Sequence, residues 1–415
     1  MNNMKSAQFA SLLLISAFTF TASAGDWPQW RGPNRDGLSK ETGWQTAWPE
    51  SGPKKLWEAP VGVGYSSASV SQGRVYTMGN VEDKDAIHCF DGESGKVLWK
   101  HEYPCEAKDP NGFPGPRCTP TVDGDLVYSL SRHGDVYCLE AKTGKVKWSK
   151  NLVKGLGGRE PMHGDDGSRQ GWGYSGSPLI EKGWMLIEAG GKGASVVALD
   201  KLTGALVWKT GDDGAGYSSL IATELQGERA FVQFSDNDII GRRMKDGSEL
   251  WRQVWKTSYG VNAATPILAD GEVFVSSGYG TGCAKYKIGP GALTEVWRNK
   301  NMRNHVNSCV LVNGFLYGFD EGELKCLDWK TGEVKWSEKS YGKGALMFAD
   351  GKLILYSQSG KLGVAEATPD SFKQIASVQA LKGNNTWAPP VLANGRIFVR
   401  SLDTLAAVDV SSAKP

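Results

Sequence analysis

A phrase that ends in tryptophan recurs along this chain and constrains its fold more than any other feature. In each copy an apolar strand ends near an acidic residue, a turn containing glycine follows, and a second strand leads to the tryptophan. The copies are FDGESGKVLW, LEAKTGKVKW, LDKLTGALVW, RMKDGSELW and LDWKTGEVKW, with IGPGALTEVW as a degenerate one. Successive tryptophans are 49, 60, 43, 46 and 39 residues apart. This period is typical of a repeated unit of four short strands.

The residues around each tryptophan indicate why it recurs. Val146 stands two positions before Trp148, and Val334 two positions before Trp336, so each pair shares one face of its strand. The glycine of the turn can adopt a positive φ. A tryptophan at one site of nearly every unit favours a repeated packing contact between neighbouring units over a series of ligand sites.

A hairpin pattern precedes each phrase. Segments such as CTPTVDGDLVYSL and PPVLANGRIFVRS join two apolar strands through an Asp-Gly or Asn-Gly turn. Together with the phrase, the hairpin makes four antiparallel strands per unit. Eight innermost strands are expected, beginning near Ser66, Cys118, Ser175, Ser218, Ala263, Val306, Ala345 and Ala388.

The two ends of the chain complement each other. The seventh unit carries SFKQIASV where the others have tryptophan, and the eighth ends after its third strand, LAAVDV. Residues 54–61, around Trp57, have the pattern of an outer strand without a unit of their own. The chain is therefore predicted to be all-β, a single eight-bladed β-propeller of four-stranded antiparallel blades whose last blade is closed by an N-terminal strand. The alternative, an open solenoid, would leave both ends uncapped.

The N-terminus has the features of an export signal. Lys5 is followed by an apolar stretch from Phe9 to Phe20 and by the cleavage pattern Ala22-Ser23-Ala24. An uncleaved anchor is the alternative, but the stretch is shorter than the ~20 residues of a membrane span. The expected organisation is a signal peptide over 1–24, a lead segment over 25–53 and the propeller over 54–415, in the periplasm or outside the cell.

Charge and cysteine content limit the partners and the chemistry. The 47 basic and 45 acidic residues nearly balance, which argues against a nucleic-acid partner. No cysteine adjoins the cleavage site to carry a lipid, and no later segment has the pattern of a transmembrane helix. Cys105 and Cys118 bracket one Pro/Gly-rich loop and could form a disulfide or remain free. Cys89, Cys138 and Cys326 stand ten residues before a tryptophan and are expected to be small buried hydrophobes.

The repeated phrases resemble those of the quinoprotein-like (PQQ-like repeat) β-propellers over about residues 54–410. The lead motif DWPQWRGPNRDG, from Asp26 to Gly37, resembles one at the start of exported bacterial proteins of that kind. The resemblance implies one of two functions. Some relatives are dehydrogenases that hold pyrroloquinoline quinone (PQQ) and a calcium ion on the propeller axis. Others are non-catalytic BamB-like propellers, such as the scaffold of the machine that assembles outer-membrane β-barrels.

The residues just before each innermost strand are expected at one mouth of the central channel. They are Tyr65, Arg117, Trp172 with Tyr174, Tyr217, Asn262, His305, Lys343, and Asn385 with Trp387. This ring is aromatic, mildly cationic and without a carboxylate, whereas calcium takes six to eight oxygen ligands that normally include Asp or Glu. The adjacent cysteines, axial aspartate and C-x-x-C-H motif of the dehydrogenases have no counterpart here. No catalytic or metal-binding residue is therefore assigned, and PQQ with Ca²⁺ remains a cofactor whose ligands are not recognised.

The ring offers ligand-binding chemistry even without catalytic residues. Arg117 could pair with a carboxylate or phosphate, and His305 could titrate near neutral pH. Trp172, Tyr174 and Tyr217 could stack on a flat or sugar-like ring. The alternative is that these residues only fill the channel and bond to neighbouring backbone.

A long insertion precedes the third innermost strand. The segment KGLGGREPMHGDDGSRQGWGYSG carries five polar residues of interest: Glu160, His163, Asp165, Asp166 and Arg169. It is expected to overhang the mouth. Its two aspartates are a weak metal candidate, for which a solvated turn is the alternative.

The function hypothesis that follows is an exported, non-catalytic binding or scaffold protein of the cell envelope. It would bind a partner protein or polymer through the propeller mouth. Two alternatives remain open: a PQQ-dependent alcohol or sugar dehydrogenase with an altered site, and a sensor of a small molecule or glycan.

Overall fold

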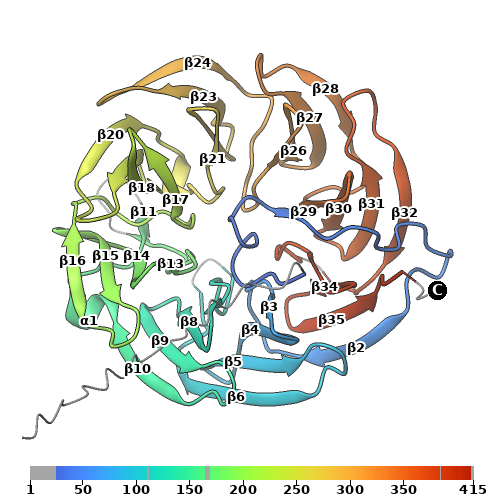
Figure 1. The fold of residues 1–415 in the computed structure, drawn as a ribbon, viewed down its shortest axis with the longest axis horizontal. Coiled ribbons are helices and arrows are strands. Elements are labelled where there is room, and N and C mark those ends of the chain that lie inside the picture. The colour runs from blue at the N-terminus through green and yellow to red at the C-terminus, as the bar shows by residue number, and fades with distance from the viewer. Residues whose placement is uncertain (1–24, 110–111, 164–168, 384, 413–415) are drawn as a thin grey trace, which may run out of the picture.

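Eight blades of four antiparallel strands form a closed ring in the computed structural model (Figure 1). In one blade the sheet gains a fifth strand, which comes from the lead segment and pairs in parallel. The structure describes residues 25–109, 112–163, 169–383 and 385–412. The chain runs once around the ring, and each sheet is one blade of a propeller. The eight-bladed β-propeller expected from the repeats is therefore confirmed.

Within each of the first seven blades, the strand numbers increase from the channel outward. The first four blades are β3–β6 (Ser69–Ser71, Arg74–Val81, Lys84–Asp91, Val97–Pro104), β7–β10 (Thr121–Asp123, Leu126–Leu130, Asp135–Glu140, Val146–Asn151), β13–β16 (Leu179–Glu181, Trp184–Gly191, Ala194–Asp200, Leu206–Thr210) and β17–β20 (Ile221–Leu225, Glu228–Phe234, Asp238–Arg243, Glu249–Val254). The next three are β21–β24 (Ile267–Ala269, Glu272–Ser277, Gly282–Ile288, Leu293–Asn299), β25–β28 (Val310–Val312, Phe315–Asp320, Glu323–Asp328, Val334–Glu338) and β29–β32 (Gly344–Ala349, Lys352–Ser357, Lys361–Glu366, Gln374–Gln379).

The eighth blade is built from both ends of the chain. Strands β33 (Val391–Ala393), β34 (Arg396–Arg400) and β35 (Thr404–Asp409) are completed by β2 (Lys55–Pro60), which pairs antiparallel with β35. The guanidinium of Arg400 crosses from this blade to the first, donating to the carbonyl of Ser66 at 2.9 Å and to Oγ1 of Thr77 at 2.9 Å. The predicted closure around Trp57 is thus confirmed, and it leaves no open seam between the eighth and first blades.

The recurring tryptophans join each blade to the next. Nε1 of Trp99 donates to the carbonyl of Ala141 at 2.9 Å, and Nε1 of Trp148 to that of Lys201 at 3.1 Å; each acceptor lies in the turn of the following blade. Trp57, Trp297 and Trp336 make the same bond to the carbonyls of Gly92, Trp329 and Thr368. Trp251 differs, because its ring packs against Gly241 of its own blade. The repeated packing contact predicted from the sequence is confirmed: five tryptophans make this hydrogen bond, and Trp208 packs against Gly247 of the next blade without it.

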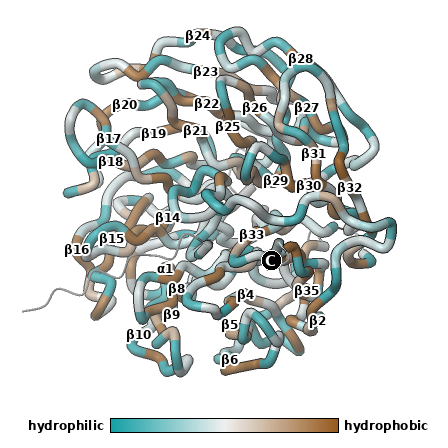
Figure 2. Tube along the Cα trace, turned by 45° about the vertical axis from the view of Figure 1, so that its right-hand side comes forward, coloured by the Kyte–Doolittle hydropathy of each residue, from teal (hydrophilic) through white to brown (hydrophobic). Residues whose placement is uncertain are grey.

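The turn glycine is required by the same contact. Gly144 has φ +71°, and a Cβ added there would lie 2.6 Å from Cε3 of Trp99. Gly95, Gly204, Gly247 and Gly332 meet the ring of the preceding blade's tryptophan in the same way. Outside this contact, the outer strands β6 and β10 alternate buried and exposed residues, so hydrophobic and hydrophilic positions alternate along the blade edges (Figure 2).

The lead segment closes one end of the central channel. Residues 26–41, called the channel plug from here on, run across the middle of the ring, drawn in blue in Figure 1. The plug contacts the innermost strand, or the residues flanking it, in all eight blades: Trp27 with Val70, Pro28 with Val122, Arg35 with Ser177 and Leu220, Trp30 with Thr265, Arg31 with Cys309, β1 (Leu38–Ser39) with β29, and Glu41 with Asn394.

Two buried arginines hold the plug in place. Arg35 donates to the carbonyls of Ser177 at 3.2 Å, Leu220 at 2.9 Å and Pro178, and Arg31 donates to the carbonyl of Cys309 at 2.6 Å. Burial lowers the pKa of Arg31 to about 10 and that of Arg35 to about 9, so both remain cationic at neutral pH. Backbone carbonyl groups that point toward the axis of the ring stabilise the positive charge of both arginines.

Replacing a turn glycine separates the tryptophan contact from the backbone effect. Gly144→Ala should destabilise the fold by the cost of positive φ, about 1–2 kcal/mol, and by a further ~1–3 kcal/mol because the methyl group overlaps Trp99. Gly351→Ala is the matched control, since Gly351 has φ +73° and open space around it. Denaturant unfolding of both variants measures the difference, and equal losses would contradict the interblade contact.

Removing the guanidinium of Arg35 should loosen the plug. Arg35→Ala leaves three buried carbonyls without their donor, and we expect the free energy of unfolding to fall by about 2–5 kcal/mol. Arg243→Ala serves as control, because Arg243 forms a half-exposed ion pair with Glu228 at 2.8 Å and should change stability by less than about 1 kcal/mol. Thermal unfolding monitored by near-ultraviolet circular dichroism tests both; an Arg35 variant as stable as the control would contradict the proposed anchoring.

Candidate functional site

A cavity of about 140 Å³ lies on the channel axis, at the mouth formed by the segments before the innermost strands. It is called the aromatic cup below. Its lining is Trp30, Tyr65, Phe113, Arg117, Trp172, Ser175, Tyr217, Ser219, Val261, Ala263, Tyr279, His305, Val306, Trp387 and Pro389. Six of the eight ligand-binding residues predicted from the sequence are among them: Tyr65, Arg117, Trp172, Tyr217, His305 and Trp387.

Ring contacts run almost continuously around the wall of the cup. The pairs and their centroid distances are Tyr65–Trp387 at 4.9 Å, Phe113–Trp387 at 5.0 Å, Trp387–His305 at 6.3 Å, His305–Tyr279 at 5.0 Å, Tyr279–Tyr259 at 5.5 Å, Tyr259–Trp172 at 6.4 Å and Trp172–Tyr217 at 5.7 Å. These separations are those of favourable stacked and edge-to-face pairs. The rings therefore support one another, and the wall offers aromatic faces and edges in several orientations.

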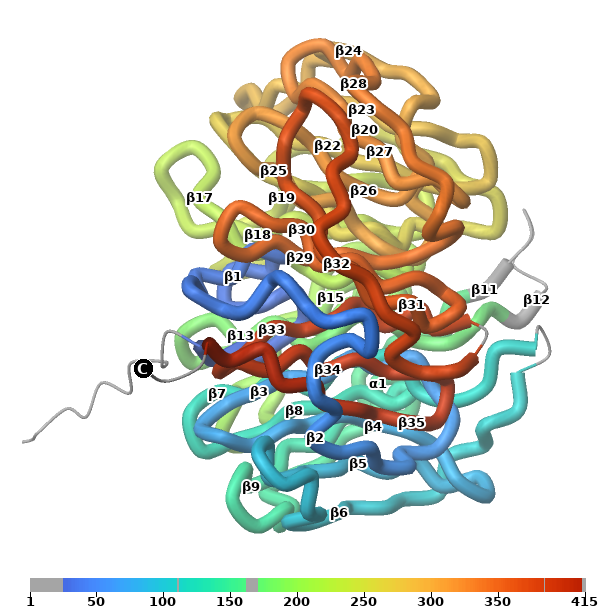
Figure 3. The backbone as a smooth tube through the Cα atoms, turned by 90° about the vertical axis from the view of Figure 1, so that its right-hand side faces the viewer, coloured from blue at the N-terminus to red at the C-terminus, as the bar shows by residue number. Residues whose placement is uncertain are grey.

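The channel plug forms the floor of the cup. Trp30 lines the cavity, and its Nε1 donates to Oγ1 of Thr265 at 3.0 Å. In the side view, β1 lies toward one face of the ring and the hairpin of β11 (Met162–His163) and β12 (Arg169–Gln170) toward the other (Figure 3). The plug thus occupies the end of the channel away from the mouth, so the cup is a pocket with a closed floor and not a through channel.

Arg117 carries the charge closest to the cup, and its hydrogen bonds are made within the protein. Its guanidinium donates to Oδ2 of Asp109 at 3.0 Å, to the carbonyl of Gly115 at 3.1 Å and to the carbonyl of Phe113 at 2.6 Å. Asp109 is buried and also accepts from Arg132 at 3.0 Å. Burial lowers the pKa of Arg117, and the negative charge of Asp109 opposes that fall. The cation is therefore paired and serves as part of the wall, which disfavours the bidentate anion contact considered from the sequence.

The other titratable groups of the cup are neutral near pH 7. Burial lowers the pKa of His305 below its ordinary value, and the positive charge of Lys343 lowers it further. Burial raises the pKa of Tyr65, Tyr217 and Tyr279, which keeps the three phenols protonated. The cup consequently presents aromatic faces and neutral hydroxyl groups, with one internally paired cation at its edge.

Two residues predicted to face the channel lie behind the wall. Tyr174 is buried, and its hydroxyl donates to the carbonyl of Ala189 at 2.8 Å. The amide of Asn262 is also buried; it donates to the carbonyls of Ser235, Asp236 and Trp255 and accepts from Thr257 and Ser277. A buried amide is stable only with its partners in place, so Asn262 holds the loop and does not face the cup. Lys343 and Asn385 also lie outside the lining.

Three aromatic cup residues were not selected from the sequence. Phe113 comes from the loop between Cys105 and Cys118, Tyr279 from the turn between β22 and β23, and Trp30 from the plug. Tyr259 is not part of the lining, but its ring contacts those of Trp172 and Tyr279. The GYGTG segment around Tyr279 and the WRG segment at Trp30 were visible as turn-rich sequence. Nothing in their local pattern indicates which way the ring points.

The described part of the long insertion, which was expected to overhang the mouth, lies beside it. It contains helix α1 (Leu152–Leu156) and the β11–β12 hairpin, and β11 lies against the short 3₁₀ turn η1 (Ser258–Gly260) that carries Tyr259. Glu160 bonds Nδ1 of His133 at 3.1 Å. Asp165 and Asp166 fall outside the described residues. Within the described ranges, no group of three or more His, Cys, Asp or Glu side chains is placed to hold a metal ion.

All seven cysteines are buried free thiols. The disulfide considered between Cys105 and Cys118 is not formed, although both residues lie in one hydrophobic cluster. Burial raises the pKa of Cys118 to about 12 and keeps its thiol protonated. The expectation that Cys89, Cys138 and Cys326 act as small buried hydrophobes is confirmed.

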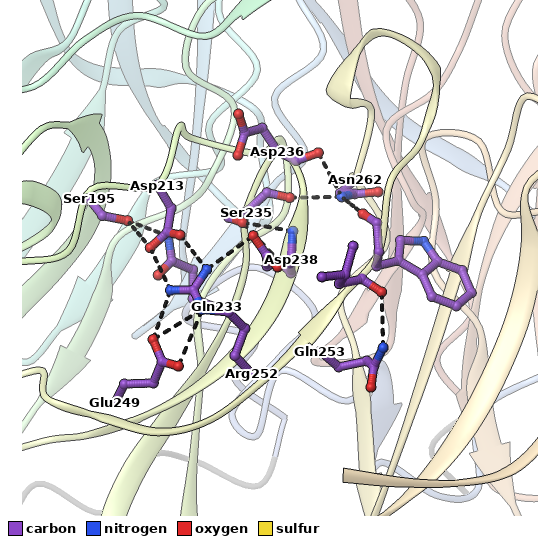
Figure 4. A network of polar contacts seen from close by, with 12 residues as sticks. Ser195, Asp213, Gln233, Ser235, Asp236, Asp238, Glu249, Arg252, Gln253 and Asn262 are labelled. Carbon is purple, nitrogen blue, oxygen red and sulfur yellow. Dashed lines mark hydrogen bonds and ion pairs between the residues drawn. The ribbon is translucent and has the colours of Figure 1, made fainter. Parts of the chain in front are cut away.

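A polar network between the third and fourth blades supports the loops of the cup (Figure 4). Arg252 bonds Asp213 at 2.5 Å, Asp238 at 3.0 Å and Glu249 at 2.7 Å. Asp213 belongs to the segment that leads to Tyr217, and on the other side of the network Asn262 bonds the carbonyl of Ser235 at 2.8 Å. The network thus ties the backbone on both sides of this part of the wall to the rigid strands below.

Glu188 is buried next to this network. Nε2 of Gln233 donates to Oε1 of Glu188 at 2.7 Å. Burial raises the pKa of Glu188 to about 8, although the bonds from Gln233 and from the backbone of Gly216 oppose the rise. Because Gly216 directly precedes Tyr217, the protonation state of Glu188 bears on the stability of the cup wall.

The cup does not fit PQQ with calcium. Among the described residues, those lining the cup include no Asp or Glu, whereas a calcium ion requires several oxygen ligands. The nearest carboxylate, Asp109, is already shared by two arginines. No step of a quinone-dependent oxidation is therefore derived from this site.

Sequence comparison connects the propeller to a known family. The family described as outer membrane protein assembly factor BamB matches residues 109–338, which is more than half of the chain. The chain belongs to this family of PQQ-like β-propellers. A curated BamB of Moranella endobia is 24% identical over 323 residues, covering 69% of this chain and 72% of that protein.

Quinone-dependent alcohol dehydrogenases share a shorter region. The dehydrogenase subunit of the quinone alcohol dehydrogenase of Komagataeibacter europaeus is 29% identical over 150 residues, or 34% of this chain. That region is 18% of the length of the relative. The similarity is therefore confined to part of the propeller.

Solved structures show the same architecture. BamB from Moraxella catarrhalis superposes with a TM-score of 0.62 and 14% identity, covering 86% of this chain and 99% of that one. The quinohemoprotein alcohol dehydrogenase of Comamonas testosteroni has a TM-score of 0.53 and 12% identity, covering 94% and 81% of the two chains. At these identities the likeness shows the fold alone. In the described part of the chain, no helix is long and apolar enough to cross a membrane.

The raised pKa of Glu188 predicts a pH-dependent stability. Between the ordinary pKa near 4.5 and the folded value of about 8, the folded state holds one more proton than the unfolded state. The contribution of this group to stability is thus complete below pH 4.5 and declines up to pH 8, at most by about 1.4 kcal/mol per pH unit. Glu188→Gln, which keeps an acceptor for Gln233, should remove that decline. Melting temperatures of both proteins from pH 4 to 9 test this, and parallel curves would contradict it.

Proposed function

We propose that this protein is a non-catalytic binding protein of the cell envelope that takes part of a partner molecule into the aromatic cup. The observation that carries the proposal is the closed, aromatic and internally neutralised form of the cup. A mouth ringed by stacked side chains can bind a ligand by contact, but it presents no activated nucleophile and no set of metal-binding carboxylates.

Membership of the BamB family supports a role in the envelope. The relative in Moranella endobia is described as an outer membrane protein assembly factor, and by analogy the partner would be an envelope protein or an envelope polymer. Fold-level analogy cannot choose between these, because one scaffold hosts many functions. The partner is therefore proposed on the chemistry of the mouth.

Export remains part of the same proposal. The features of a signal peptide over residues 1–24 lie outside the described residues, and they support cleavage near Gly25 and a location in the periplasm or outside the cell. Asp26, the second residue after the proposed cleavage site, is the first residue of the plug and accepts hydrogen bonds from Oγ of Ser71 at 3.1 Å and from the backbone of Gln72. Processing there would leave the plug intact.

Native mass spectrometry of the protein isolated from the producing cells tests the proposal. A bound species should copurify with the wild-type protein and be lost from the double variant Trp172→Ala/Trp387→Ala, because both rings line the cup. Trp48→Ala is the matched control: this tryptophan lies in the lead segment outside the cup, and its Nε1 donates to the carbonyl of Gln45 at 3.0 Å.

Two outcomes would overturn the proposal. One is a bound species that the double variant retains at the wild-type level. The other is oxidation of an alcohol or sugar after addition of PQQ and Ca²⁺, measured with an artificial electron acceptor, which would favour the dehydrogenase alternative that the local similarity to the Komagataeibacter subunit suggests.

A further inference from the structure

We infer that the aromatic cup binds the terminal pyranose ring of a neutral saccharide. This inference rests on the proposed binding function and names the ligand class. It follows from four properties of the cup that are considered in turn: its charge, its size, its floor and its polar groups.

The charge of the cup disfavours ionic ligands. An anion would need donors from Arg117, but three of the five N–H groups of that guanidinium already donate to Asp109, Gly115 and Phe113. A cation held by the aromatic faces would be attractive in isolation, yet it would lie beside Arg117, which is 5.6 Å from the centroid of Tyr65. An uncharged ligand avoids both conflicts.

The size and floor of the cup limit what can enter. A volume of about 140 Å³ corresponds to roughly ten water positions, which suits one six-membered sugar ring. Trp30 and the channel plug close the lower end, so a chain cannot thread through. A polymer can therefore offer only its end or a side group, and the ring must be the outermost one.

The polar groups of the cup match a ring that carries hydroxyl groups. The phenols of Tyr65, Tyr217 and Tyr279 line the cavity. Phenol hydroxyl groups and sugar hydroxyl groups can each donate and accept hydrogen bonds. The faces of Trp172, Trp387 and Tyr65 would pack against the C–H faces of the sugar.

A competing ligand of similar size is an aromatic side chain at the end of a partner peptide. It would use the same ring faces but would leave the phenol hydroxyl groups of the cup without new hydrogen-bond partners. The hydroxyl of Tyr279 separates the two ligands, because a sugar hydroxyl would bond to it and an aromatic side chain would not. Tyr279 is 39% exposed, so removing its hydroxyl should not disturb the core.

Direct titration of the full chain tests the inference. The probes are neutral methyl glycosides of common hexoses, oligosaccharides with the same terminal ring, the corresponding uronic acids and amino sugars, and N-acetyl-phenylalanine amide. Binding is measured by calorimetry and by the fluorescence of the three cup tryptophans. We expect at least one neutral glycoside to bind, and Trp387→Ala to weaken it by about tenfold or more. Tyr279→Phe should weaken it by about two- to tenfold, and Trp48→Ala should have no effect.

The oligosaccharide probes identify the source of the sugar. Equal affinity for a glycoside and its oligosaccharide would indicate that a free sugar suffices, whereas tighter binding of the oligosaccharide would indicate a polymer end with contacts on the rim. Both results support the inference.

Three results would overturn it: binding of charged sugars only, binding of N-acetyl-phenylalanine amide with no effect of Tyr279→Phe, or no binding of any glycoside. In the last case, a species that copurifies with the protein and is lost from the Trp172→Ala/Trp387→Ala variant would still support the proposed binding function. The ligand class would then be wrong while the function stands.

Discussion

Buried guanidinium groups bonded to backbone carbonyls hold the parts of this propeller in one arrangement. Eight blades around an axis leave a channel into which the ends of the innermost strands direct their carbonyl groups. Arg31 and Arg35 enter that channel from the plug and donate to carbonyls on three different blades. Arg400 makes the equivalent bridge between the last blade and the first. Without these donors, polar backbone would be buried without partners and the channel would be open to water.

The cup is a consequence of this closure. Because the plug fills one end of the channel, the loops at the other end surround a pocket with a floor, and Trp30 belongs to both structures. The aromatic wall could not be held by loops alone. It rests on the blades through Asn262, through the Arg252 network and through Asp109, which pairs with both Arg117 and Arg132 of the second blade. Binding sites formed by loops usually depend on a rigid scaffold that positions those loops.

Particular residues show how far sequence reasoning reaches into such a fold. The tryptophan contact was predictable, since the pair of Trp99 and Gly144 repeats with the unit and each copy supports the others. The closure by Trp57 was predictable from counting strands. Six of the eight predicted cup residues line the cavity because they stand directly before an innermost strand, where the fold itself directs them to the mouth. Tyr174 stands at such a position as well, yet its side chain points into the core and bonds Ala189.

The sequence by itself determined the repeating unit, the number of blades and the way the ring closes, because strand alternation and turn chemistry are local and recur eight times. Only the tertiary structure decided that the lead segment becomes a plug, that Phe113, Tyr279 and Trp30 join the cup, and that Arg117 is already paired. These properties arise where loops about fifty residues apart meet at one axis. The direction of a side chain there depends on the neighbouring group that it packs against or hydrogen-bonds to. That group comes from another loop, so the local sequence pattern does not identify it.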